Sequence, residues 1–288
     1  MRIVSKTLLL AASVALYLTS CKKTETPTEK LPLNAVGLVD STSTDSLIAR
    51  RTKLLTDSTW RYYEYFVNYS QDSAKLVFKR GKAANTINLN LNQTKFNTDG
   101  TCREITETGQ QLNGTWALLN NGTQIRVTNS YGTFTSNIKE LTANNFEWQS
   151  VDGATYGVEM SVFPTTDYSR TATAKITGRT WKYLAYFTNY PLASANLAYR
   201  SNRTYNPILN LSLNRINFYT DGTYKEVSET GAVSYGTWYL SNNDTRITVQ
   251  QNGNYPAFTA LITVLTSDRF EWNRLDNNYY YYGEQVAL

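Results

Sequence analysis

The sequence predicts an all-β protein made of two tandem antiparallel β domains. A domain-sized passage is written twice, since WRYYEYFVNY at 60–69 returns as WKYLAYFTNY at 181–190. Within each copy the apolar residues follow a period of two, and β-branched and aromatic residues dominate, which is typical of strands. About eight short strands per copy, with turn signals and no long helix, favour an antiparallel barrel or sandwich. Shorter motifs repeat in the same order: FNTDGT at 96–101 and FYTDGT at 218–223, GTW at 114–116 and 236–238, and FEW at 146–148 and 270–272.

The N-terminus has the pattern of an export signal. A basic start precedes an apolar run at 8–18 that is too short to span a bilayer permanently. The run leads into LTSC, ending at Cys21, which resembles the lipobox of bacterial lipoproteins. That resemblance implies loss of residues 1–20, lipidation of Cys21 and a membrane anchor; an uncleaved anchor helix is the alternative. Lysines follow the cysteine where an aspartate would signal inner-membrane retention, so we expect an outer-membrane lipoprotein of the cell envelope, in either leaflet.

The rest of the chain divides into four segments. Residues 21–54 predict a flexible tether, because polar residues and prolines predominate and little burial is available to offset chain entropy. Towards its end, from Ser46 to Leu55, we expect a short helix with Asp45 as its cap. The first domain is expected at 55–163, a linker at 164–175 and the second domain at 176–288, each domain long enough to fold around its own core.

Charge and cysteine content narrow the functional classes. The chain has 28 basic and 23 acidic residues, and loss of the signal leaves 26 basic residues and a net charge of +3. The basic residues are scattered rather than clustered, so we expect no nucleic-acid partner. Cys102 is the thiol that remains after lipidation, which leaves no intramolecular disulfide; we expect it to be buried or incidental.

Two local patterns predict strands and turns within each copy. The segments 85–92 and 206–214 alternate polar and apolar residues, so each is expected to be a strand with one buried face. The Asp-Gly pairs at 98–101 and 220–223 lie between strand-like runs and predict tight hairpin turns. A calcium loop is the alternative for these pairs, but no further ligand follows at calcium spacing.

The order of motifs resembles the lipocalin-like domains of lipoproteins from Bacteroidetes. In each copy a Trp is followed by Phe-x-x-Asp-Gly-Thr, Gly-Thr-Trp, an Ile-x-Val strand and Leu-Thr-x-x-x-Phe-Glu-Trp. The resemblance covers nearly all of both copies and implies two small lipocalin-like β-barrels. Trp60 and Trp181 lack the Gly-x-Trp motif that true lipocalins carry on the first strand. A wide ligand-filled cup is therefore in doubt, and the chain's own side chains can fill barrels of this length.

The residue types exclude several chemistries. The chain has no histidine, which removes Ser-His and Cys-His nucleophiles and the commonest transition-metal ligand, so we expect no enzyme activity, cofactor or metal. Carboxylates leave one enzymatic alternative, because Glu104 and Glu107 recur as Glu226 and Glu229. Residues three apart on a strand point to opposite faces, which argues against a shared substrate. The acids of the FEW motifs point away from the Phe and Trp face; we expect Glu147 and Glu271 to be solvated or paired across strands.

Tyrosines are the main candidates for binding. On the first strand of each copy, alternation places Trp60 and Trp181 in the core and a set of tyrosines on the opposite face. These tyrosines form a platform for a sugar ring, a hydrophobic ligand or a partner protein. The alternatives are that they girdle a small barrel with their hydroxyl groups in water, or that the two faces are exchanged. The candidate binding residues are Tyr63, Tyr65, Tyr69, Tyr186 and Tyr190.

Four serines resemble bacterial O-glycosylation sites. Each follows an aspartate in the Asp-Ser/Thr-apolar (or Thr) pattern of Bacteroidetes, and three precede Trp60. Sugar would protect the tether from proteolysis, whereas chance in a Ser- and Asp-rich stretch is the alternative. The candidate residues are Ser41, Ser46, Ser58 and Ser73.

Together these patterns predict a lipid-anchored cell-envelope protein whose two β domains form a non-catalytic binding or envelope-associated module. Its expected partners are the membrane, through the anchor, and a hydrophobic small molecule, a glycan or an envelope protein. One alternative is a glycan-binding surface lipoprotein that uses Tyr and Trp platforms. The other is a carboxylate-dependent glycan hydrolase.

Overall fold

The computed structural model describes residues 41–164, 170–192, 195–203, 209–253, 255–276 and 279–288. The expected signal peptide, Cys21 and the tether as far as residue 40 lie outside these ranges, as does part of the expected linker. Ser41–Leu288 form one compact unit. In the described ranges this unit is all-β, with nine strands in each repeat where the sequence predicts about eight.

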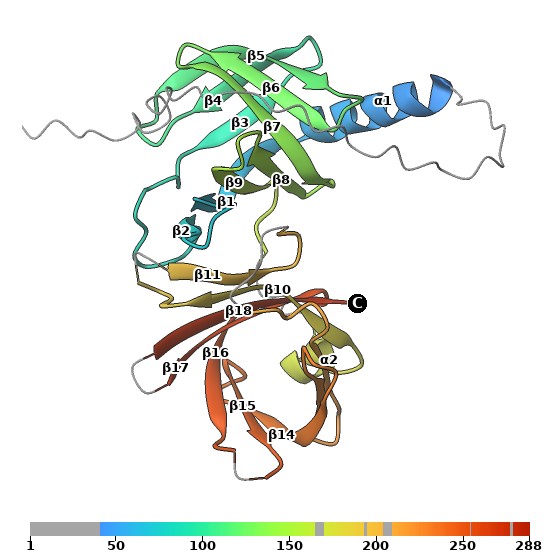
Figure 1. Cartoon of the computed structure of the whole chain (residues 1–288), viewed down its shortest axis with the longest axis vertical. Coiled ribbons are helices and arrows are strands. Elements are labelled where there is room, and N and C mark those ends of the chain that lie inside the picture. Colours follow the sequence, from blue (N-terminus) through green and yellow to red (C-terminus); the bar gives the residue numbers. More distant parts are fainter. Residues whose placement is uncertain (1–40, 165–169, 193–194, 204–208, 254, 277–278) are drawn as a thin grey trace, which may run out of the picture. The chain divides into compact units, whose positions relative to one another are not determined.

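Each repeat begins with a helix and continues as a run of strands (Figure 1). The first repeat comprises α1 (Ser41–Asp57), β1 (Thr59–Val67), β2 (Lys75–Lys79), β3 (Gln93–Phe96), β4 (Thr101–Ile105), β5 (Gln111–Leu119), β6 (Gln124–Asn129), β7 (Gly132–Leu141), β8 (Asn145–Ser150) and β9 (Thr155–Met160). The second comprises α2 (Ala172–Ile176), β10 (Thr180–Thr188), β11 (Ala195–Arg200), β12 (Arg215–Phe218), β13 (Thr223–Val227), β14 (Val233–Ser241), β15 (Arg246–Gln251), β16 (Phe258–Leu265), β17 (Arg269–Asp276) and β18 (Tyr279–Ala287).

The strands of the first repeat close on themselves. From β3 to β9 each strand pairs antiparallel with the next. The first strand, β1, completes the circle, because it pairs with β9 along its length and with β3 at its start. The result is a closed, eight-stranded antiparallel barrel, and β2 is an extra strand on the second half of β1. A closed barrel leaves few strand edges exposed for pairing with other chains.

The second repeat has the same set of pairings. Strand β10 pairs with β18 along its length, with β12 at its start and with the extra strand β11 at its end. The two extra strands also pair with each other, Leu76 opposite Ala195 and Lys75 opposite Asn196. One continuous set of backbone ladders therefore runs through both repeats.

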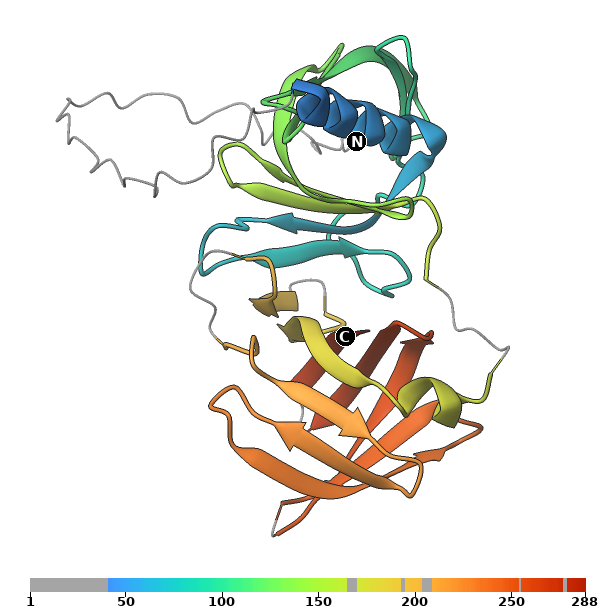
Figure 2. The same cartoon turned by 90° about the vertical axis from the view of Figure 1, so that its right-hand side faces the viewer.

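A helix lies against one end of the strands in each repeat. Figure 2 shows α1 lying across the strands of the first repeat, and α1 contacts β3 and β7. The fully buried Trp60 donates its Nε1 hydrogen to the carbonyl of Leu55, the last buried residue of α1, at 2.9 Å. Trp181 makes the same 2.9 Å bond to Ile176 of α2. Both tryptophans are core residues, as the sequence predicts.

Large apolar side chains fill the barrel interior next to these helices. Alternate residues of successive strands point inward, so each strand contributes one or two rings or branched chains. The buried cluster in the first repeat consists of Leu55, Trp60, Phe96, Cys102, Trp116, Ile125, Ile138 and Phe146, and the second repeat has an equivalent cluster around Trp181, Phe218, Trp238 and Phe270. Cys102 is buried there. A wide cup at this end is therefore absent from the described part of the chain.

The Asp-Gly motifs form the predicted turns. In the first repeat the Asp99 carboxylate accepts hydrogen bonds from the backbone nitrogen and Oγ1 of Thr101, at 2.9 and 2.7 Å. These bonds lower the pKa of Asp99. Gly100 has a φ of +81°, a conformation that glycine adopts without steric cost. The second copy repeats this geometry at Asp221 and Thr223.

Among the predicted elements, the helix near residue 46 is confirmed with an earlier start, whereas the strand predicted at 85–92 is wrong. The segment 85–92 forms no strand, because Asn side chains bond nearby backbone and Arg80 binds the carbonyl groups of Leu89 and Asn90. The described part of 206–214 is likewise irregular. The helix expected from residue 46 begins at Ser41 and so contains Asp45, its expected cap. None of the helices in the described ranges is long and apolar enough to cross a membrane.

Candidate functional site

Three of the predicted binding tyrosines are buried, so the prediction that they form an exposed platform is wrong. Tyr63, Tyr69 and Tyr190 are between 2 % and 6 % exposed and belong to a cluster shared by both repeats. These three rings are buried because the two repeats pack against each other, and the predicted faces of β1 are further altered by two register shifts, one between Tyr62 and Glu64 and one between Tyr65 and Phe66. Each shift breaks the alternation of faces on which the prediction depends.

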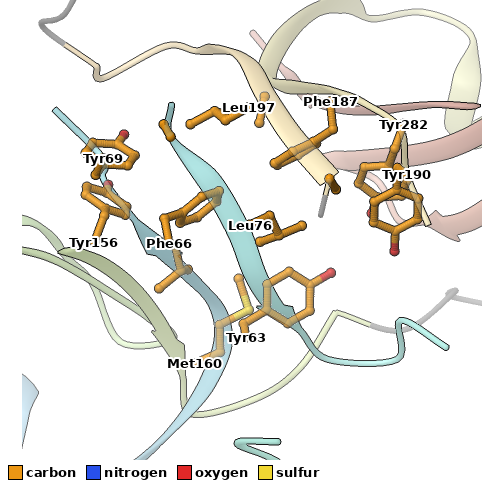
Figure 3. Close-up of a cluster of buried hydrophobic side chains, with 14 residues drawn as sticks. Tyr63, Phe66, Tyr69, Leu76, Tyr156, Met160, Phe187, Tyr190, Leu197 and Tyr282 are labelled. Atoms are coloured by element: carbon orange, nitrogen blue, oxygen red, sulfur yellow. The ribbon is translucent and has the colours of Figure 1, made fainter. Parts of the chain in front are cut away.

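The shared cluster is arranged with approximate twofold symmetry (Figure 3). Phe66 stacks on its duplicate Phe187 with ring centroids 6.1 Å apart. On one side of this pair Tyr69 stacks on Tyr156 at 4.2 Å, and on the other Tyr190 stacks on Tyr282 at 4.1 Å. Phe66 and its duplicate thus meet at the centre, and the tyrosine pair of one copy is matched by the equivalent pair of the other, as in the self-complementary interface of a twofold dimer.

Buried charges lie beside these rings. The Lys79 ammonium is 2.8 Å from both Glu64 and Glu284. Arg200, the duplicate of Lys79, is 2.8 Å from Glu64 and 3.3 Å from Glu147. The acids of both FEW motifs are in this network, because Glu271 binds Lys79 at 3.5 Å and also pairs with Arg269. Of the two expected alternatives for these acids, solvation is wrong, since each acid is buried and paired with a cation of the network.

Protonation of one carboxyl group, that of Glu284, reduces the negative charge of this network. Burial raises the pKa of Glu284 to about 8, and the neighbouring Glu64 carboxylate adds to the rise. Burial opposes the charged form of Glu64, but Lys79 and a hydrogen bond from Glu284 hold its pKa well below the usual range. At neutral pH Glu284 therefore keeps its proton and donates a hydrogen bond to the Glu64 carboxylate. The network is sealed from solvent, so we interpret it as the structural junction of the repeats.

The other two predicted tyrosines lie on the inward faces of the strands of their repeats, at the end away from the helices. Tyr65 and Tyr186 each pack on the Trp of the FEW motif, with centroids 6.1 Å apart in both copies. In the first repeat Tyr62 completes the group, 5.6 Å from Tyr65 and 6.4 Å from Trp148. These three partly exposed rings line what we call the mouth of the first barrel.

Two carboxyl groups join the rings at this mouth. Glu104 follows Cys102 by two residues on β4, so it shares the inward face. Glu159 follows Gly157 by two residues on β9, and a side chain at Gly157 would collide with Trp148. Trp148 Nε1 donates to Glu159 Oε1 at 2.8 Å. Glu159 is 5 % exposed, and its Oε2 has no hydrogen-bond partner among the described residues.

Burial controls the protonation of both acids. It raises the pKa of Glu159 to about 7; the Trp148 hydrogen bond opposes the rise and Glu104 adds to it. Burial also raises the pKa of Glu104, although Asn129 donates to its Oε2 at 3.1 Å. Perturbed acids in a partly open, ring-lined setting are typical of functional sites.

The carboxylate pair differs from the one that the sequence suggests. Glu107 lies in the turn after β4, so Glu104 has Glu159 as its carboxyl neighbour inside the barrel. Sequence reasoning missed Glu159. The signal was present, since one acid interrupts the otherwise apolar run at 156–160 on the face opposite Tyr156 and Val158.

The candidate glycosylation serines occupy varied positions. Ser41 is the first residue of α1, and Ser46 is an exposed residue within the same helix. Ser58 lies partly exposed between α1 and β1, and Ser73 is exposed in the turn before β2. Their modification stays a prediction.

Comparisons with known proteins give limited matches. No protein-family model matches the sequence, and no curated protein matches it. A lipocalin-like protein from Bacteroides uniformis is weakly similar in structure: 12 % identity, 38 % of this chain and 99 % of that chain, TM-score 0.28. An endo-1,5-alpha-L-arabinanase from Thermotoga petrophila is similar at 10 % identity over 79 % of this chain and 66 % of that chain, TM-score 0.25.

Proposed function

We propose that the protein is a lipid-anchored binding protein of the cell envelope, built from two tandem lipocalin-like barrels, and that the mouth of its first barrel takes a small ligand. The observation that carries this proposal is the buried Glu159 carboxyl group, which lies beside Trp148 with one oxygen unpartnered in the described structure. A buried polar atom without a partner costs about 1–3 kcal/mol. A ligand that hydrogen-bonds this oxygen offsets that cost.

The junction of the repeats supports a tandem arrangement. The same pairings recur in both repeats, and the stacked rings and buried ion pairs involve residues of both. Such a junction fixes the two barrels against each other, so the second barrel acts as a rigid support for the first.

A binding role accounts for the acids better than a hydrolytic one. Glycoside hydrolysis requires one protonated and one ionised carboxyl group at the same site. Here Trp148 donates a hydrogen bond to Glu159 and Asn129 donates one to Glu104, and aromatic rings pack beside the acids, an arrangement that suits the holding of a ligand. The hydrolase alternative predicts sugar release from envelope polysaccharides, and loss of that release in the Glu159→Gln variant.

Ligand binding is tested with a thermal-shift screen of the mature protein against fatty acids, oligosaccharides and amines. We expect at least one class to raise the melting temperature of the wild type, because ligand that binds only the folded state stabilises it. The same ligand should have a smaller effect on Glu159→Gln. This substitution is mild, since Gln285 occupies the same position in the second repeat. A screen with no hit in all three classes would contradict the proposal.

The anchor is tested separately. Substitution Cys21→Ser should release the protein from the membrane fraction into the soluble fraction of the envelope or the medium. Membrane fractionation of that variant equal to the wild type would contradict the lipoprotein assignment while leaving ligand binding intact.

A second candidate function, glycan binding, is favoured by one strand of the second repeat. Tyr235 and Tyr239 are 56 % and 59 % exposed on the outer face of β14, where the first repeat has Asn113 and Ala117. Exposed rings on one strand face suit stacking on sugar rings. Affinity electrophoresis in polysaccharide gels should show retardation that the double substitution of both tyrosines by alanine removes. The exposed Tyr131 of the first repeat provides the control, Tyr131→Ala.

A further inference from the structure

The duplication allows the mouth of the first barrel to be compared with its counterpart. Four groups recur in both repeats: two tyrosines on the first strand of the repeat, the Trp of the FEW motif, and one glutamate, which is Glu104 on β4 or Glu226 on β13. In the second repeat Tyr183 and Tyr186 are 5.8 Å apart, close to the 5.6 Å of the first repeat. A side chain at Gly283 would collide with Trp272, as at the equivalent glycine of the first repeat. The two mouths therefore have the same framework.

The second mouth contains a cation that belongs to the chain itself. Arg274 follows Trp272 by two residues on β17 and so shares its inward face. Its guanidinium carbon lies 4.4 Å from the ring centroid of Phe258 and 5.4 Å from that of Tyr281. Both distances are within the range of cation–π attraction. The ring-lined mouth of this fold thus accommodates a positively charged group.

The first mouth lacks this cation and has smaller side chains around it. Ser150 stands where the second repeat has Arg274, and Thr155 stands where it has Tyr281. Phe134, the counterpart of Phe258, lies on the inward face of β7 yet is 47 % exposed. The first mouth thus has smaller side chains at the positions of the cation and its covering ring, and its remaining ring, Phe134, is exposed.

The first mouth also carries one more acid. Glu159 replaces Gln285, so the first repeat has two carboxyl groups where the second has Glu226 and an amide. Within the described ranges neither Glu104 nor Glu159 is part of an ion pair. The first mouth thus gains negative charge and loses positive charge relative to its own duplicate.

We propose that the mouth of the first barrel binds an organic cation, an ammonium or guanidinium group, in the position that Arg274 occupies in the second repeat. This inference rests on the proposed binding function and names its ligand class. Tyr62, Tyr65 and Trp148 line this mouth, and Phe134 is the counterpart of the Phe258 ring that Arg274 contacts, so aromatic rings surround the proposed position as in aromatic cages. Glu104 and Glu159 attract the cation by their negative charge, and where the cation carries N–H groups, as a guanidinium does, the unpartnered Oε2 of Glu159 gains a donor.

Protonation adds a signature that a neutral ligand lacks. Tyr62 and Glu104 are the titratable groups that face Glu159, while Glu107, Cys102 and Tyr62 face Glu104. Because a cation favours the ionised form of a carboxyl group, its binding lowers the pKa of Glu159 from about 7 and releases a proton. Binding therefore strengthens as pH rises from 6 to 8.

The test is isothermal titration calorimetry of the mature protein with choline and arginine amide as cationic probes and 3,3-dimethylbutanol as the neutral isostere of choline. We expect one saturable site for a cationic probe, at least tenfold weaker binding of the isostere, and proton release at pH 7. Ser150→Arg, which copies the second repeat, should weaken binding at least tenfold. Thr263→Arg adds the same charge at an exposed position of β16 and should leave binding unchanged.

Two further variants keep the test decisive if Ser150→Arg does not fold. Glu159→Gln should weaken cation binding and remove its increase between pH 6 and 8. Arg274→Ser should open a second, weaker site. Equal binding of choline and its isostere would overturn the cation inference and leave the binding function standing. Absence of binding by both cationic probes would also overturn it, and the ligand screen described above then decides whether the binding function falls as well.

Discussion

Replacing Lys79 by methionine removes the cation at the junction of the two repeats while keeping a side chain of similar length. The ammonium group is 2.8 Å from Glu64 and 2.8 Å from Glu284, and its side chain is 3 % exposed. It also lies 4.2 Å from the ring centroid of Tyr63. The substitution therefore removes one of the two cations that pair with Glu64 and with Glu284, while Arg200 and Arg269 keep their own pairs with these acids.

Removing one partner of a buried ion pair costs about 3–5 kcal/mol of unfolding free energy, because the remaining charge is uncompensated. In a chain of this size that corresponds to a fall of roughly 6–20 °C in melting temperature. The loss should be smaller at pH 5 than at pH 7, because protonation of the carboxyl groups removes part of the uncompensated charge.

The assay is urea denaturation followed by tryptophan fluorescence at both pH values. Lys53→Met is the matched control, because Lys53 and Asp57 form an ion pair of nearly the same length, 2.7 Å, with side chains 75 % and 53 % exposed. Exposed pairs of this kind contribute about 0.3–0.5 kcal/mol. Equal losses in the two variants would refute the argument that burial makes the junction charges important.

Three further predictions concern pH, core and anchor. Burial raises the pKa of Glu159 to about 7 and that of Glu284 to about 8 in the folded protein, above the ordinary carboxyl value. The folded state therefore binds more protons than the unfolded state, and stability should fall as pH rises from 6 to 9. Glu284→Gln should flatten this decline in denaturation curves, and an unchanged slope would contradict the assignment. Trp60→Ala and Trp181→Ala should each lower the unfolding free energy by about 3–5 kcal/mol, and a loss below about 1 kcal/mol would show that these rings are not core. Cys21→Ser should shift the protein out of the membrane pellet in a fractionation blot.

The sequence alone was sufficient where repetition and local geometry agree. The duplicated Trp60 and Trp181 have the same core position and the same hydrogen bond to the preceding helix. The Asp-Gly turns form because the carboxylate of Asp99 binds the backbone of Thr101 and glycine adopts the required φ angle. These features depend on residues a few positions apart, which a single sequence displays directly.

The tyrosine faces could not be derived from the sequence, because strict alternation fails at a bulge. The register shift between Tyr62 and Glu64 turns the second half of β1 towards the other repeat. Trp60 therefore lies in the barrel core while Phe66 stacks on Phe187. No pattern within one strand shows that a second domain covers its outer face.

For the acids, too, the sequence predicts the direction of a side chain but not what surrounds it. Glu147 and Glu271 follow the expected direction, away from the Phe and Trp face, yet they are buried because the partner repeat supplies cations there. Glu159 was overlooked because a lone acid in an apolar strand has no local partner. Its importance is clear once the barrel brings β4, β8 and β9 around one mouth.

The most direct test of the account is a crystal structure of the mature protein with arginine amide bound. We predict ligand density among Tyr62, Tyr65 and Trp148, with the guanidinium group within hydrogen-bond distance of Glu159, and no ligand in the second mouth, where Arg274 lies. A first mouth that holds only water at saturating ligand, or ligand bound equally in both mouths, would contradict the account.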